Sequence, residues 1–173
     1  MKRTLCIVLL ALTTAVAGCA PGSVLSRPAT DLARSDLPRQ VEPEADEHDV
    51  RLLAAGNAAF ALDLYAALRG QPGNLFFSPH SIAQALAMTY AGAAGETERQ
   101  MREVLRFDLL DERVHPAWNA LDLALASRAE DLGHAEGTGF TLHTANALWG
   151  QTGYAFREEF LDALAAHYDA GMR

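Results

Sequence analysis

The junction between a short apolar run and the helix-like stretch after it constrains the fold of this chain more than any other feature. Asn74–Phe77 has strand character and stops at Ser78-Pro79. Because proline has no N–H to give to a β-ladder, a strand there must end at that point. Ser81 is a plausible N-cap for the next helix. Residues 82–91 are apolar nearly all round, which indicates a helix buried on all sides.

Hydrophobic periodicity predicts the other helices. Apolar residues at helical spacing predict a first helix from near Val50 that stops at Gly70. The sequence "TERQ", residues 97–100, has the pattern of a capping box that opens a helix. His115-Pro116 is typical of another helix start, because proline suits the first helical position. A last helix is predicted over 156–168.

A second strand is predicted over Phe140–Trp149. Its alternating residues are apolar or small on both sides, as in a strand covered on both faces. The order is therefore helix, strand, helix, helix, helix, strand, helix, an α+β pattern. Two strands so far apart in the chain do not form a sheet core by themselves. We therefore expect these residues to form part of a larger fold.

The first residues are typical of an export signal. "MKR" is a basic head, and Thr4–Val16 is an apolar run of signal-peptide length. Small residues then precede Cys19 in "VAGC", which resembles the lipobox of bacterial lipoproteins. That resemblance implies that the Cys19 thiol takes a diacylglycerol and that Cys19 becomes the N-terminus. An ordinary signal peptide with a chance cysteine is the alternative.

These patterns predict three regions along the chain. Residues 1–18 are the signal peptide, 19–47 are a flexible tether rich in proline and polar residues, and 48–173 are the folded part. The expected location is across the inner membrane, with the chain held by its lipid in the outer membrane or periplasm or at the cell surface. The membrane is therefore an expected partner, through the lipid on Cys19.

Charge and residue spacing exclude several functions. The formal net charge is −8 without a basic cluster, which argues against nucleic acid as a partner. Ser78, His80 and Ser81 lack the G-x-S-x-G context of a hydrolase nucleophile. The six histidines lack metal-ligand spacing, so we expect no catalytic residue, metal or cofactor. Asn146 lies among apolar residues in its predicted strand and needs a hydrogen-bond partner if it is buried.

Four stretches resemble the N-terminal part of a serpin. They are "NAAFALDLYAAL" (57–68), "NLFFSPHSIAQALAMTYAGAAGETERQM" (74–101), "LHTANALW" (142–149) and "FREEFLDALAAHYDAG" (156–171). The resemblance runs in order over about 48–173. It implies an incomplete serpin fold, with helices A to E, the first strand of sheet B and strand 2 of sheet A.

The resemblance also implies roles for particular residues. Ser78, Pro79 and Ser81 match the Ser-Pro-x-Ser segment of the serpin shutter, which lies beneath the place where sheet A parts. Asn146 matches the family's asparagine in strand 2 of sheet A. In this interpretation the apolar helix at 82–91 lies under a sheet that must open. These four positions are structural and not catalytic.

An inhibitory serpin, by this resemblance, is cleaved in its reactive loop by a serine protease or, in some cases, a cysteine protease. The loop then enters sheet A as a new strand and carries the acylated protease with it. We expect that this chain lacks the reactive loop and does not inhibit a protease alone, so that a target serine protease is a partner of the complete form only. The alternative is a non-inhibitory, lipid-anchored interaction protein derived from a serpin.

Overall fold

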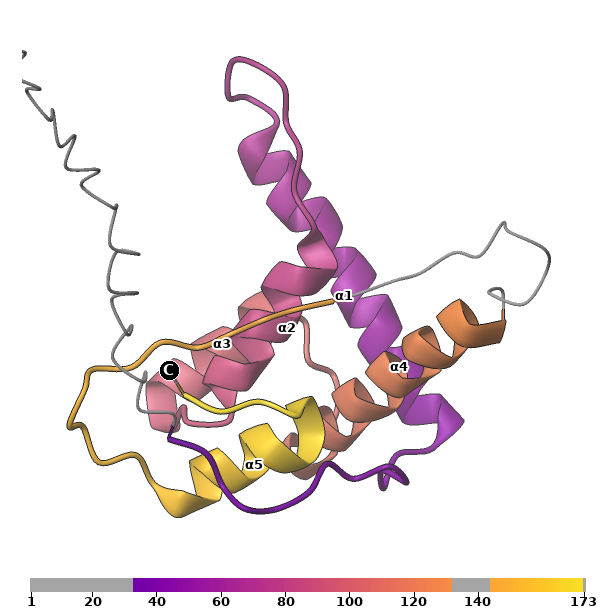
Figure 1. Cartoon of the computed structure of the whole chain (residues 1–173). Helices are drawn as coiled ribbons and strands as arrows, with labels where there is room; N and C mark the ends of the chain where they lie inside the picture. The colour runs from indigo at the N-terminus through magenta and orange to yellow at the C-terminus, as the bar shows by residue number, and fades with distance from the viewer. Residues whose placement is uncertain (1–32, 132–143, 173) are drawn as a thin grey trace, which may run out of the picture. The chain divides into compact units, whose positions relative to one another are not determined.

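The computed structural model describes residues 33–131 and 144–172. These residues contain five α-helices (Figure 1). Helix α1 packs against α2 and α4, and α4 also packs against α5. The helices are α1 (Glu47–Leu68), α2 (Pro79–Tyr90), α3 (Gly95–Val104), α4 (Asp111–Asp131) and α5 (Glu158–Tyr168).

Helix α1 begins with a reciprocal capping box. The Asp46 side chain accepts from the Asp49 N–H at 2.9 Å, and the Asp49 carboxylate accepts from the Asp46 N–H at 3.2 Å. The helix predicted from near Val50 is thus confirmed, with an earlier start. It is long and apolar enough to cross a membrane by length and composition alone, but its inner face packs into the core through Leu53 and Phe60.

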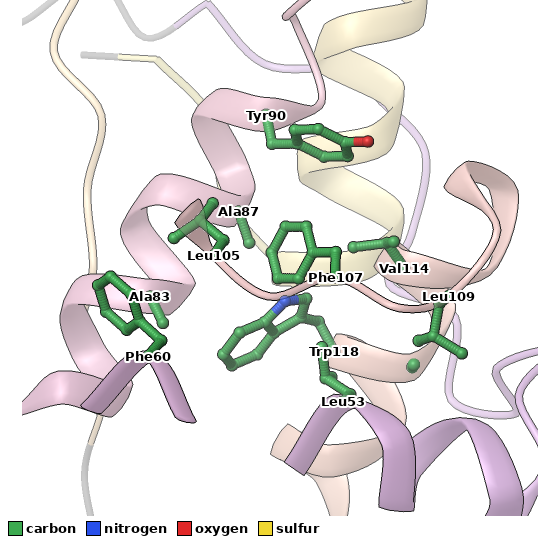
Figure 2. Close-up of a cluster of buried hydrophobic side chains, with 11 residues drawn as sticks. Leu53, Phe60, Ala83, Ala87, Tyr90, Leu105, Phe107, Leu109, Val114 and Trp118 are labelled. Atoms are coloured by element: carbon green, nitrogen blue, oxygen red, sulfur yellow. The ribbon is translucent and has the colours of Figure 1, made fainter. Parts of the chain in front are cut away.

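The main core surrounds Trp118 of α4, whose side chain is fully buried (Figure 2). Gly56 of α1 lets the chain after α3 approach closely, because a Cβ added there would lie 2.2 Å from the Arg106 carbonyl oxygen. Buried side chains from α1, α2, α4 and residues 105–109 form one cluster. The other buried members are Leu53, Phe60, Ala83, Ala87, Tyr90, Leu105, Phe107, Leu109, Val114 and Ala117.

The predicted strands are not formed in the residues that the structure describes. Asn74–Phe77 has no strand pairing there, and the Phe76 side chain is fully exposed. Within 144–149, Leu148 makes a single parallel bridge, to Met172. Residues 140–143 lie outside the described part. The physical reason is that a strand needs a neighbour for its N–H and C=O groups, whereas a helix supplies its own.

Three predicted helix starts were wrong in position. Ser78, and not Ser81, caps α2, with Pro79 in the first turn. Helix α3 begins at Gly95 without a side-chain cap, so the capping box predicted at Thr97 is not formed. Helix α4 begins at Asp111 and has Pro116 inside it. Proline costs one helical hydrogen bond there, and burial of its neighbours, including Trp118, offsets that loss.

Helix α2 is not buried on all sides in the described structure. Ala83, Gln84, Ala87, Met88 and Tyr90 are buried, while Ile82 and Leu86 are 36% and 37% exposed. The prediction failed because an all-apolar pattern carries no information about which face has a neighbour. The outer face of α2 therefore remains open within the described residues.

Part of the predicted tether is held against the helices. We call residues 33–46 the N-terminal strap. Ala33 exchanges two backbone hydrogen bonds with Met172, at 3.0 and 2.8 Å, and the Gln40 N–H donates to the Ala166 carbonyl at 2.9 Å. Polar composition suggested a free segment, but it does not reveal which polar groups find partners. Residues 19–32, including Cys19, lie outside the described part.

Candidate functional site

The first turn of α2 brings together three of the four residues predicted for the shutter. Ser78 has extended backbone and its Oγ accepts from the Ser81 N–H at 3.3 Å. The Ser78 hydroxyl also donates to the Ser81 hydroxyl at 3.1 Å. Pro79 occupies the first turn, where its missing N–H costs nothing. This turn satisfies its own polar groups locally.

His80 is engaged elsewhere and does not form a nucleophile–base pair with either serine among the described contacts. Its Nδ1 lies 3.1 Å from the Asn57 amide nitrogen, which can only donate, so Nδ1 accepts. The ring lies 5.4 Å from the Trp118 ring, centroid to centroid. Burial lowers the pKa of His80, and the charge of Asp122 opposes that shift. The neutral ring is therefore a packing group between α1, α2 and α4.

Asn146 contacts the same helix in its second turn, at Gln84. Its Nδ2 donates to the Gln84 Oε1 at 2.7 Å, and Gln84 is 7% exposed. The expectation that Asn146 needs a polar partner if buried fits this bond, although the side chain is half-buried. Gln84 was missed from sequence. Its signal was available, because Gln84 is the single amide side chain within the apolar stretch 82–88 of α2.

A polar cavity of about 290 Å³ lies beside Asn146 and Gln84. Its charged groups are already paired: Arg39 donates to Asp122 at 2.6 Å, and Arg34 is ion-paired with Asp169. Sequence reasoning did not single out these residues. The lining also includes Met88, Thr144, Ala145, Ala147, Tyr168, Ala170 and Gly171.

The two groups of predicted residues are linked through α2 and not by direct contact. Ser78 and Ser81 fix the start of the helix, and Gln84 in its second turn holds Asn146. No hydrogen bond joins Asn146 to either serine among the described residues. This arrangement positions an extended segment, residues 144–149, on a helix, and it offers no group for bond-breaking chemistry.

A cluster of titratable rings lies between α4 and α5. The His115 Nδ1 lies 2.8 Å from the Tyr168 hydroxyl, and the His115 and His167 rings stack with centroids 6.1 Å apart. Burial, with a smaller contribution from His167, lowers the pKa of His115 to about 4. Burial also lowers the pKa of His167 and raises that of Tyr168. These groups are therefore uncharged at neutral pH.

The neighbouring polar contact joins α2, α3 and α4. The Tyr90 hydroxyl donates to the Asp111 carboxylate, which also pairs with Arg102. Burial, followed by the hydrogen bond to Asp111, raises the pKa of Tyr90 to about 12. Within residues 33–131 and 144–172, no three His, Cys, Asp or Glu side chains are grouped to hold a metal ion.

One protein family and several individual proteins are similar to this chain. The family model described as "Serpin (serine protease inhibitor)" matches residues 55–173. A serpin-like protein of Thermococcus kodakarensis is 42% identical over 110 residues, which cover 64% of this chain and 24% of that protein. Leukocyte elastase inhibitor A of Rattus norvegicus is 35% identical over 122 residues, 69% of this chain and 30% of its own length.

The leukocyte elastase inhibitor of Sus scrofa is 38% identical over 122 residues, with the same coverage of 69% and 30%. The chain thus spans less than a third of the length of these relatives. The matched residues include α2 and the segment that carries Asn146. The chain belongs to the serpin family.

Proposed function

We propose that these residues are the N-terminal part of a suicide-type protease inhibitor that acts on a serine protease, or in some cases a cysteine protease, by inserting its reactive loop into sheet A. The observation that carries the proposal is the family match over 55–173. The mammalian relatives are leukocyte elastase inhibitors, which makes an elastase-like serine protease the first target to test.

The geometry around α2 supports this function. Asn146 places an extended segment on α2 through Gln84, and Leu148 of that segment pairs in parallel with Met172. Such pairing is the start of a parallel β-arrangement above a helix. In the turn that starts α2, the Ser78 hydroxyl donates to the Ser81 hydroxyl and accepts from the Ser81 N–H.

The test is the formation of a covalent protease complex. A serpin that has this chain as its N-terminal part is incubated with leukocyte elastase and with trypsin-like and subtilisin-like proteases. The expected product is an SDS-resistant band at the combined mass of inhibitor and acylated protease. A protease whose nucleophilic serine is changed to alanine is the control and should give no such band.

Cleavage of the loop without a stable complex, for every protease in the panel, would contradict the inhibitory proposal. That result would favour the alternative, a non-inhibitory interaction protein derived from a serpin. The 173-residue chain is tested beside it, and we expect no complex from it alone.

We further propose that the protein is a lipoprotein attached to a membrane through Cys19. The support is the order of a basic head, an apolar run and small residues before that cysteine. Expression in a bacterium with labelled palmitate should label the wild-type chain and not a Cys19→Ser variant, whereas Cys6→Ser should keep the label. Equal labelling of wild type and Cys19→Ser would contradict the anchor.

A further inference from the structure

The N-terminal strap pairs with the far end of the described chain. The Ala33 N–H donates to the Met172 carbonyl at 3.0 Å, and the Met172 N–H donates to the Ala33 carbonyl at 2.8 Å. Met172 also makes the parallel bridge with Leu148 on its other side. The extended chain at Met172 therefore lies between two neighbours, and Ala33 holds its outer edge.

Side chains fix the first half of the strap in place at two points. Near its start, Arg34 pairs with Asp169, and the Ser35 hydroxyl donates to Asp162 of α5. Further along, Arg39 donates to the Asn119 Oδ1 at 2.9 Å and to Asp122 at 2.6 Å. These contacts come from side chains on α4 and α5 and from the residue after α5. The strap is therefore attached to one turn of α4, to α5 and to the residue after α5.

Among these contacts, the one between Arg39 and Asn119 is the strongest candidate for holding the strap in place. Asn119 is fully buried, and its Nδ2 donates to the Gln40 carbonyl at 2.7 Å and to the Ala166 carbonyl at 3.4 Å. The Arg39 and Asp122 side chains are only 22% and 17% exposed, whereas those of Arg34 and Asp169 are 38% and 58% exposed. Removing one partner of a charged pair that is partly withdrawn from solvent costs more than removing one at the surface, because the remaining charge is left without a partner.

An unpaired strand edge is a template on which another chain can add a strand. The strap uses both backbone groups that Met172 would otherwise present on that edge. We propose that residues 33–40 are an edge clamp: they occupy the outer edge of the chain at Met172 and keep a second copy of this protein from pairing there. The clamp is held by Arg39, and its release would allow association edge to edge.

Hydrogen exchange on the full chain tests the clamp. The amides of Ala33, Gln40 and Met172 should exchange slowly in the wild type. In an Arg39→Met variant they should exchange at least about tenfold faster, because two charge-assisted hydrogen bonds are lost. Sedimentation velocity over a range of concentrations should show a larger share of dimers and higher oligomers for that variant. An Arg51→Met variant, which removes an exposed pair with Glu47, should change neither measurement.

A second variant separates the edge from its anchor. Ala33→Pro removes the N–H that donates to Met172 and leaves Arg39 and Asn119 untouched. It should increase self-association while the Gln40 amide stays protected. Helical circular dichroism and the fluorescence of buried Trp118 verify that both variants fold. Two results would overturn the proposal. One is an Arg39→Met variant in which the amides of residues 33–40 exchange at the wild-type rate. The other is a folded variant in which these amides exchange faster but the share of dimers and oligomers does not rise.

Discussion

The Trp118 core and the extended segments outside it show opposite behaviour in one molecule. Around Trp118, side chains from α1, α2, α4 and the 105–109 loop are all buried. In the extended segments, Phe76 is fully exposed and Trp149 is 71% exposed. Helices satisfy their own backbone groups and can bury a face as soon as two of them meet. An extended segment with the same kinds of apolar residue must first pair with a neighbouring strand before it can be buried.

The largest expected effect on stability comes from a substitution in the Trp118 core. Trp118→Ala should lower the free energy of unfolding by about 3–5 kcal/mol, since it opens a cavity where the side chain is fully buried. Trp149→Ala is the matched control and should cost under about 0.5 kcal/mol. Urea unfolding followed by circular dichroism measures both. Equal losses would mean that the two tryptophans do not differ in their packing.

Lowering the pH should destabilise the folded protein through the cluster of titratable rings between α4 and α5. The folded pKa of His115 is about 4 against 6.5 for an unperturbed histidine, so the unfolded chain binds more protons between these values. Stability should be unaffected above about pH 6.5 and should fall as the pH drops towards 4, by up to about 3 kcal/mol. His115→Gln should flatten this slope in urea titrations at several pH values. Exposed His48→Gln should keep the slope of the parent.

Close backbone approach should make one core glycine sensitive to a single methyl group. Gly56→Ala places a Cβ 2.2 Å from the Arg106 carbonyl oxygen, and backbone must move to accept it. We expect a loss of about 1–3 kcal/mol in the free energy of unfolding. Gly70→Ala, where an added Cβ meets nothing within 4 Å, is the control. A neutral Gly56→Ala would show that α1 and the 105–109 loop are not tightly packed.

The smallest expected effect on stability comes from a substitution in the extended segment 144–149. Asn146→Ala removes the hydrogen bond to the Gln84 amide, which is buried, and should cost about 1–2 kcal/mol. Hydrogen exchange over 144–149 should become faster in the same variant. Thr144→Ala, an exposed position in that segment, should leave both values unchanged. If Asn146→Ala had no effect, the segment would be held by Leu148 alone.

Helices were predictable from sequence because their information is local. The period of apolar residues identified α1 and α5, and the apolar run after Ser81 identified α2. The starts were less predictable: Ser78 caps α2 in place of Ser81, α3 begins at Gly95, and α4 begins before Pro116. The strands could not be predicted in the same way. A pattern of apolar or small residues shows that a segment tends to pair as a strand, but it does not show that a partner strand is present. Peptide 74–77 has the pattern and lacks pairing in the described chain.

In the candidate site, too, the local contacts could be predicted from sequence and the long-range contacts could not. Ser78, Pro79 and Ser81 are adjacent in sequence, and their contacts are local. Asn146 could be singled out as a polar residue among apolar ones, but its partner Gln84 lies 62 residues away. The strap was missed altogether, because the pairing of Arg39 with Asn119 and Asp122 depends on how α4 is placed. Charge and composition predict only that these residues prefer water.

The bond between Asn146 and Gln84 also fixes the register of the segment that crosses α2. A slip of two residues, about 6.6 Å along an extended chain, would keep the same face towards the helix. It would bring Leu148 or Thr144 opposite Gln84 in place of Asn146. Leucine would leave a buried amide without a partner, and threonine could restore only part of the bond. One amide in an apolar helix therefore determines at which residue the chain above it is aligned.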